Sequence, residues 1–222
     1  MSSHDEFVNF GWTTPDVEPH HKYTIPAVLN LLPKDKPLNI LDVGCGNGYL
    51  VNHLAKIGHH VVGVDIAEDG IRVAKEIYPH LRFELRSAYD KFDDLPGIPA
   101  DVVISSEVIE HLYFPQQFLK NIYEALCPGG YLILTTPYHG YLKNLMISLF
   151  NKWDQHHHSE REGGHIKFFS ERSLSRILTG NGFVSIAFQN SGRLPFFWKS
   201  MVCRARKKGG SQNGINSNNP YS

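Results

Sequence analysis

The sequence predicts an α/β fold built on a doubly wound, mostly parallel sheet of seven strands. Between residues 38 and 136, apolar segments of strand length alternate with segments of helical periodicity. Such alternation is typical of a parallel sheet whose crossover helices cover its faces. Near the end of the chain, 183–189 and 197–204 alternate apolar and polar residues. We expect these last two segments to form an antiparallel hairpin.

The expected elements follow one another in a regular order. A helix over 20–32 precedes the sheet, and Pro33 ends it. The helix over 115–126 begins with proline, which is favoured in the first turn of a helix. The last helix begins after Ser170, which can cap it, and stops at Gly180. Strands are expected at 38–43, 60–64, 80–85, 100–106 and 130–136, and the other helices at 47–57 and 67–77.

Length, charge and cysteine content exclude several classes of protein. A chain of 222 residues suits one domain, expected over 1–208 with a disordered tail at 209–222. Lys plus Arg equals Asp plus Glu at 22 each, so we expect no long nucleic acid as partner. The three cysteines are too far apart for a disulfide framework or a zinc pair. No apolar run has the length of a signal core or a transmembrane helix, so we expect a soluble, cytoplasmic protein.

Residues 40–48, Ile-Leu-Asp-Val-Gly-Cys-Gly-Asn-Gly, are the most informative segment. An apolar strand ends here in a glycine turn, and a helical pattern follows. Alternate glycines permit positive φ and close approach to a ligand, and a helix N-terminus attracts negative charge. The nicotinamide and flavin pattern G-x-G-x-x-G is not met, because Tyr49 stands at its last position. Asp65 ends the next strand, where an acid can accept hydrogen bonds from ribose hydroxyls.

The spacing D-x-G-x-G-x-G in this segment resembles motif I of the class I S-adenosylmethionine-dependent methyltransferases. Residues 101–107 resemble strand four of that class, and 126–134 resemble its Pro-Gly-Gly turn and strand five. The resemblance implies a Rossmann-like methyltransferase fold with S-adenosylmethionine as cofactor. It implies cofactor contacts from Asp42, Gly44 and Gly46 at the methionine end, Asp65 at the ribose, Ile66, Ala88 and Tyr89 at the adenine, and the backbone of Ser106 and Glu107. The segment 87–90 differs from the Gly-Asp-Ala motif that is usual in the class.

The segment Glu107-Val108-Ile109-Glu110-His111 carries a second pattern. On a helix, Glu107, Glu110 and His111 would project to one side. Such a set suits Mg²⁺ or Mn²⁺. The E-x-x-E-H pattern resembles the ubiquinone-biosynthesis O-methyltransferases and the small-RNA 3′-terminal 2′-O-methyltransferases, and by that resemblance His165 is a fourth ligand. In the alternative without a metal, His111 or His165 is the general base.

The segment 137–165 is the expected insertion over the acceptor site. Its apolar residues between Tyr141 and Trp153 recur on one helical face. One interpretation is a helix packed as a lid on the domain. The other is an acceptor-pocket wall, or an interfacial helix that meets a lipid-like substrate.

Together these patterns predict an enzyme that moves a methyl group from S-adenosylmethionine to a small-molecule acceptor, at a hydroxyl oxygen. The runner-up is an RNA 3′-terminal 2′-O-methyltransferase. A third hypothesis is a non-catalytic module that binds S-adenosylmethionine. The oligomeric state does not follow from the sequence.

Overall fold

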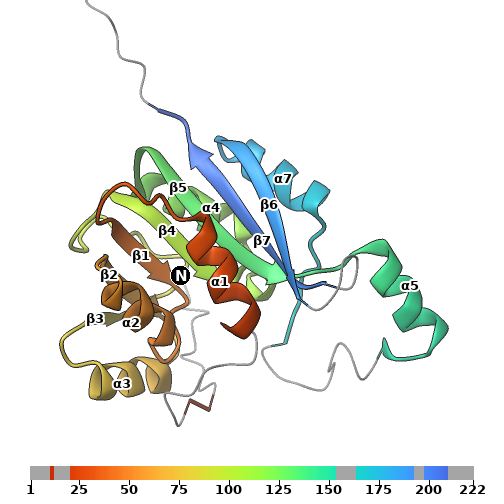
Figure 1. Cartoon of the computed structure of the whole chain (residues 1–222), viewed down its shortest axis with the longest axis horizontal. Helices are drawn as coiled ribbons and strands as arrows, with labels where there is room; N and C mark the ends of the chain where they lie inside the picture. The colour runs from red at the N-terminus through yellow and green to blue at the C-terminus, as the bar shows by residue number, and fades with distance from the viewer. Residues whose placement is uncertain (1–10, 13–20, 154–163, 193–197, 210–222) are drawn as a thin grey trace, which may run out of the picture.

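The structure is a computed structural model that describes residues 11–12, 21–153, 164–192 and 198–209 (Figure 1). Almost all of the expected tail and the middle of the 137–165 insertion lie outside these residues. Among the described residues, no helix combines the length and the apolar content needed to cross a bilayer.

Seven strands form one sheet in the order β3-β2-β1-β4-β5-β7-β6, which confirms the predicted fold class (Figure 1). The first five strands pair in parallel, and β7 runs antiparallel to both β5 and β6. The expected hairpin is therefore present. The strands are β1 Asn39–Val43, β2 His60–Asp65, β3 Arg82–Leu85, β4 Ala100–Ser106, β5 Leu126–Pro137, β6 Phe183–Gly192 and β7 Trp198–Lys207.

The helices lie close to the predicted ranges. They are α1 His21–Leu31, α2 Tyr49–Lys56, α3 Glu68–Ile77, the short 3-10 turn η1 Ile109–His111, α4 Pro115–Ala125, α5 Tyr141–Leu149 and α7 Glu171–Gly180. Pro115 occupies the first turn of α4, and the Ser170 hydroxyl accepts a hydrogen bond from the Ser173 N–H at the start of α7. Both predicted helix starts are confirmed.

One strand is longer than expected. The Pro-Gly-Gly segment was predicted as a turn, but β5 already begins at Leu126, which pairs with Ala100 of β4. The ladder then shifts register, and Gly129 has a φ of 82°. Glycine tolerates this conformation, so the strand absorbs the irregularity instead of ending there.

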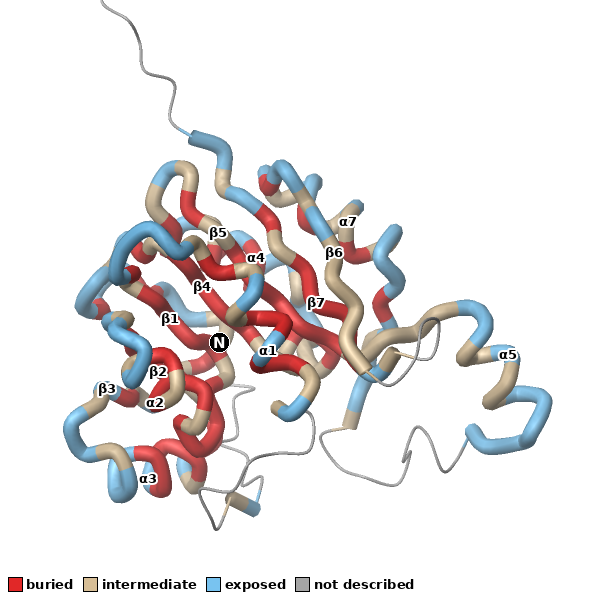
Figure 2. The backbone as a smooth tube through the Cα atoms, in the orientation of Figure 1, coloured by how far each residue is buried: buried red, intermediate tan, exposed pale blue. Residues whose placement is uncertain are grey.

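Apolar side chains fill both faces of the sheet, as a doubly wound fold requires. Successive residues of a strand point to opposite faces. Ile40 and Ile104 belong to a buried cluster shared with α1, α2 and α3, whereas Leu41 and Val103 belong to a second cluster shared with α4 and α7. Figure 2 shows the buried central strands between these helices. The carboxyl ends of β1 and β4, which are neighbours, are thus held rigidly at one edge.

The helix α5 differs from the other helices because it has no buried residue. It extends away from the sheet in Figures 1 and 2. Leu149 and Phe150 are 68% and 62% exposed. The helical periodicity is confirmed, but the interpretation of α5 as a lid packed on the domain is wrong. Both faces of the sheet are already covered by the other helices, so α5 finds no apolar surface there.

We expect the central strands to carry the stability of the fold. The Ile104→Ala substitution removes a side chain with 0% exposure and leaves a cavity, so the free energy of unfolding falls by about 2–5 kcal/mol. The matched control Ile57→Ala removes the same atoms from a residue that is 52% exposed and changes little. Urea unfolding of both variants measures the difference. Equal losses in the two variants would contradict this description of the core.

Candidate functional site

The glycine turn lies where β1 ends, at the carboxyl edge of the sheet. Gly44, Gly46 and Gly48 all have positive φ, at 86°, 51° and 76°. A Cβ atom at position 44 would stand 2.2 Å from Cγ2 of Val108, so a side chain does not fit there. The N–H group of Gly44 donates to the carbonyl oxygen of Val64 in β2 at 2.8 Å. The expectation of a glycine-dependent turn is confirmed.

Asp65, at the end of β2, holds this turn in place. Its Oδ2 accepts the N–H of Gly46 at 2.7 Å, and its Oδ1 accepts the N–H of Ala67 at 2.8 Å. Burial raises the pKa of Asp65, and these backbone hydrogen bonds counteract part of the rise. A carboxylate has about four lone-pair positions, so Asp65 can still accept a hydrogen bond from a ligand hydroxyl beside its backbone donors.

Asp42 is buried with 1% exposure beside the same turn. Its Oδ1 has no hydrogen-bond partner among the described residues. Burial, followed by the charge of Asp65, raises the pKa of Asp42 to about 7. An unpaired buried carboxyl oxygen is costly and marks a place where a donor or a positive charge would be favourable.

The loop after β3 contains Ala88 and Tyr89, both partly buried. A hydrogen bond from the Ser87 N–H to Oδ2 of Asp90 closes the loop at 3.0 Å. Asn121 of α4 donates from Nδ2 to the carbonyl oxygen of Tyr89 at 2.6 Å. Sequence reasoning did not single out Asn121, because its partner lies 32 positions away. These hydrogen bonds hold the loop in place, even though its sequence differs from the Gly-Asp-Ala motif of the class.

The chain is not helical at Glu107. The prediction that the side chain of Glu107 projects to the same side as those of Glu110 and His111 is therefore wrong. Glu107 has a φ of 56°, and its N–H donates to the carbonyl oxygen of Thr135 in β5 at 3.1 Å. The Thr135 hydroxyl donates to Oε1 of Glu107 at 2.8 Å. Burial raises the pKa of Glu107 to about 7. Because β5 holds both its backbone and its carboxyl group, Glu107 lies outside the group of metal-ligating atoms described next.

Glu110, His111 and His165 come together although 54 positions separate the two histidines. One ligand atom from each lies within 4.8 Å of the others. The two imidazole rings have centroids 4.9 Å apart, and Nε2 of His165 lies 4.0 Å from Oε1 of Glu110. The structure thus unites three of the four residues that were candidate metal ligands.

Backbone contacts explain how His165 reaches this place. The N–H groups of Ile166 and Lys167 both donate to the carbonyl oxygen of Glu110 at 3.0 Å. Glu110 itself has 0% exposure. Its Oε2 accepts the Thr136 hydroxyl at 3.1 Å, and its Oε1 has no hydrogen-bond partner among the described residues. Burial, followed by the charge of Glu107, raises the pKa of Glu110 well above its usual range.

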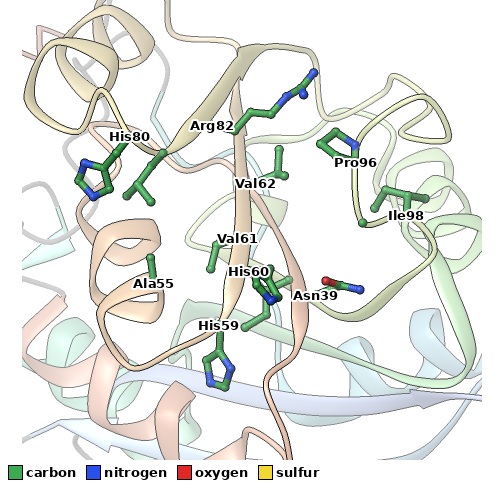
Figure 3. Close-up of a pocket in the computed structure, with 13 residues that line it drawn as sticks. Asn39, Ala55, His59, His60, Val61, Val62, His80, Arg82, Pro96 and Ile98 are labelled. Atoms are coloured by element: carbon green, nitrogen blue, oxygen red, sulfur yellow. The ribbon is translucent and has the colours of Figure 1, made fainter.

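A separate hollow of about 310 Å³ lies at the opposite edge of the sheet (Figure 3). It is lined by residues at the amino ends of β1, β2 and β3, among them Asn39, His60 and Arg82. None of the candidate site residues lines it. Ligands of open α/β sheets bind at the carboxyl ends of the strands, where the order reverses, here between β1 and β4. We therefore place the functional site at the glycine turn.

The buried Asp42 makes the free energy of unfolding depend on pH. Between its ordinary pKa of 3.8 and about 7, the folded chain keeps a proton on Asp42 that the unfolded chain releases. The free energy of unfolding contributed by this group therefore falls as the pH rises through that range. In Asp42→Asn the fall is smaller, whereas the exposed control Asp93→Asn keeps the native profile. Urea unfolding of the three proteins at about pH 5 and about pH 8 tests this, and identical profiles would contradict it.

Comparison with known proteins gives the family. A family model described as methyltransferase domain matches residues 19–187. The mitochondrial ubiquinone biosynthesis O-methyltransferase of Rattus norvegicus is 34% identical over 158 residues, which cover 66% of this chain and 45% of the relative. The ubiquinone biosynthesis O-methyltransferase of Xylella fastidiosa is 32% identical over 147 residues, which cover 61% and 59%. The chain thus spans less than two thirds of the length of these relatives.

Solved structures share the fold. A S-adenosylmethionine-dependent methyltransferase from Methanosarcina mazei superposes with a TM-score of 0.62 at 22% identity, covering 83% of this chain and 98% of the other. Magnesium protoporphyrin IX methyltransferase from Synechocystis, solved with bound S-adenosylhomocysteine, gives 0.60 at 21% identity, covering 83% and 80%. At these identities the likeness concerns the fold alone. The family model, however, spans most of the chain and includes the glycine turn, and the chain therefore belongs to the methyltransferase-domain family, among the class I S-adenosylmethionine-dependent methyltransferases.

Proposed function

We propose that this chain transfers a methyl group from S-adenosylmethionine to a hydroxyl oxygen of a small-molecule acceptor. The observation that carries the proposal is the pair of aspartates at the glycine turn. Asp65 keeps capacity to accept a hydrogen bond from a ligand hydroxyl, and Asp42 has a buried oxygen without a hydrogen-bond partner among the described residues. The preference for oxygen is supported by the relatives, which are named O-methyltransferases.

The residues present fit the cofactor at three points. The positive φ of Gly44 and Gly46 bends the backbone at the end of β1, and neither residue adds a Cβ atom of its own that would keep a ligand away from the turn. Asp65 suits the two ribose hydroxyls. The buried carboxyl of Asp42 suits the positively charged methionine end, because a nearby cation favours the ionised form of a carboxyl group.

When bound, S-adenosylmethionine supplies an electrophilic methyl group on a sulfonium sulfur. The acceptor oxygen forms the new C–O bond with a lone pair, the S–C bond breaks, and sulfur keeps the bonding electrons as the neutral thioether. The proton of the acceptor hydroxyl goes to a base of the protein. Such an in-line displacement depends chiefly on positioning, which the rigid turn and strand ends provide.

His165 is the base that we assign first, and His111 is the second candidate. The side chain of His165 is 39% exposed, so an acceptor can reach it, and its Nε2 lies 4.0 Å from Oε1 of Glu110. A neutral imidazole at this place takes the proton from the acceptor hydroxyl. The Nδ1 of His111 lies 3.3 Å from the carbonyl oxygen of Gly164, which orients that ring.

A divalent metal is a second candidate component. Beside two imidazoles lies Oε1 of Glu110, which has no hydrogen-bond partner in the part of the chain that the structure describes. One carboxylate and two imidazoles suit a first-row metal such as Mn²⁺ better than Mg²⁺, which prefers oxygen ligands. A cation bound there would lower the pKa of an acceptor hydroxyl. Glu107 is not part of this proposal, because Thr135 holds its carboxyl group.

The acceptor that fits best is small and partly apolar. Tyr113 and Phe114, within three residues of His111, are 72% and 65% exposed, and α5 carries further exposed apolar side chains. We propose α5 as a surface for such an acceptor or for the interface that presents it. An RNA terminus remains the alternative acceptor, and a cofactor-binding module without turnover is the alternative from another class.

A methyl-transfer assay distinguishes the small-molecule methyltransferase, the RNA methyltransferase and the non-catalytic binding module. The native chain, incubated with S-adenosylmethionine and a panel of phenols, sugars and short RNA, adds one methyl group to a phenolic or other small hydroxyl acceptor, as mass spectrometry would show. Asp65→Asn weakens the binding of S-adenosylhomocysteine about tenfold or more, because the site loses a charge-assisted acceptor. The exposed control Asp93→Asn binds as the native chain does. Methylation confined to RNA selects the runner-up, and binding without turnover on any acceptor contradicts the enzyme.

Metal binding has its own readout. Calorimetric titration with Mn²⁺ gives a binding constant for the native chain that weakens at least about tenfold in Glu110→Gln, since the only carboxylate of the set becomes neutral. Glu124→Gln, an exposed control on α4, leaves it unchanged. Absence of Mn²⁺ binding to the native chain, with turnover that survives EDTA, would leave His165 as the base without a metal.

A further inference from the structure

Trp12 lies on the glycine turn itself. If Gly46 carried a Cβ, that atom would stand 2.7 Å from Cζ2 of the indole. At Gly70, in the first turn of α3, a Cβ would stand 3.1 Å from Cδ1 of the same ring. The indole therefore packs against two backbone segments, at Gly46 and at Gly70. A side chain at either position would displace the ring.

A hydrogen bond fixes the backbone of Trp12 to α3. Its N–H donates to Oδ2 of Asp69 at 2.6 Å. In Figure 1 the two described residues 11–12 form a short coloured piece near α3. The contact thus has two independent parts, a polar one through Asp69 and an apolar one through the indole. Asp69 is one residue before Gly70, so both parts meet the same turn of the helix.

The indole packs against backbone that holds Asp65, the carboxylate assigned to the ribose hydroxyls. Gly46, which the ring covers, donates its N–H to Asp65 at 2.7 Å, and Ala67 donates to the other oxygen of Asp65 at 2.8 Å. Gly46 therefore both borders the indole and donates to this carboxylate. An aromatic ring packed against this backbone offers a flat apolar surface to a nucleoside held by the carboxylate.

We propose that Trp12 is a cofactor-binding residue whose indole forms one wall of the site for the adenosine part of the ligand, with Asp69 as its positioning residue. This inference rests on the proposed function, since it requires a nucleoside at Asp65. A purely structural role, in which the ring only pins the chain to α3, predicts that ligand affinity does not depend on the indole.

The chain contains three tryptophans, Trp12, Trp153 and Trp198, which allows a direct optical test. In the double variant Trp153→Phe with Trp198→Phe, Trp12 is the only indole that emits. Titration with S-adenosylhomocysteine changes this emission, and the change is half-maximal at the dissociation constant found by calorimetry. This readout leaves the proposed wall intact, so it does not depend on whether a Trp12 variant folds.

Affinity gives the second readout. Trp12→Ala weakens S-adenosylhomocysteine binding about tenfold, Trp12→Phe by about threefold or less, and Asp69→Ala by about threefold. Trp153→Ala, four residues beyond the end of α5 and 44% exposed, is the matched control and binds as the native chain does. Native affinity or tighter binding in Trp12→Ala, or Trp12 emission that ignores the ligand, overturns the inference. If the native chain binds no S-adenosylhomocysteine, the proposed function fails and the inference fails with it.

Discussion

The fold and the site depend on one constraint, the attachment of the glycine turn to the end of β2. The carbonyl oxygen of Val64 accepts the N–H of Gly44, and Asp65 accepts the N–H of Gly46. These bonds set the turn in a conformation that only glycine adopts easily, and they aim α2 at the same place. The apolar clusters on both faces of the sheet make the attachment rigid. The site is therefore organised before any ligand binds, which is what an in-line displacement requires.

This organisation has a cost in stability. Asp42, Asp65, Glu107 and Glu110 all have raised pKa values because burial disfavours their charged forms. Two of them, Asp42 and Glu110, keep an oxygen without a hydrogen-bond partner among the described residues. A core selected for stability alone would replace such groups with apolar residues. Their concentration at the carboxyl edge is explained by a ligand that carries positive charge, and a sulfonium cofactor does so.

Much of this could be predicted because it is encoded locally. Strand and helix periodicity gave the seven-stranded sheet, and the glycine spacing located the turn. The side chain of Glu107 could not be placed, because its positive φ depends on Thr135, which is 28 positions away on β5. The lid interpretation of α5 failed for a similar reason, since periodicity identifies an apolar face but not the surface that covers it. The contact of Trp12 with Gly46 and Gly70 likewise depends on the folded chain. The cytoplasmic location and the absence of a long nucleic acid partner stay predictions.

The central claim is that a sulfonium nucleoside lies across the carboxyl ends of β1 and β2. A crystal structure of the chain grown with S-adenosylhomocysteine tests it most directly. The account predicts density for the ligand over the glycine turn, with both ribose hydroxyls hydrogen-bonded to Asp65 and the methionine end toward Asp42. Density for the ligand at another edge of the sheet, or a folded chain that excludes it at saturating concentration, would contradict the account.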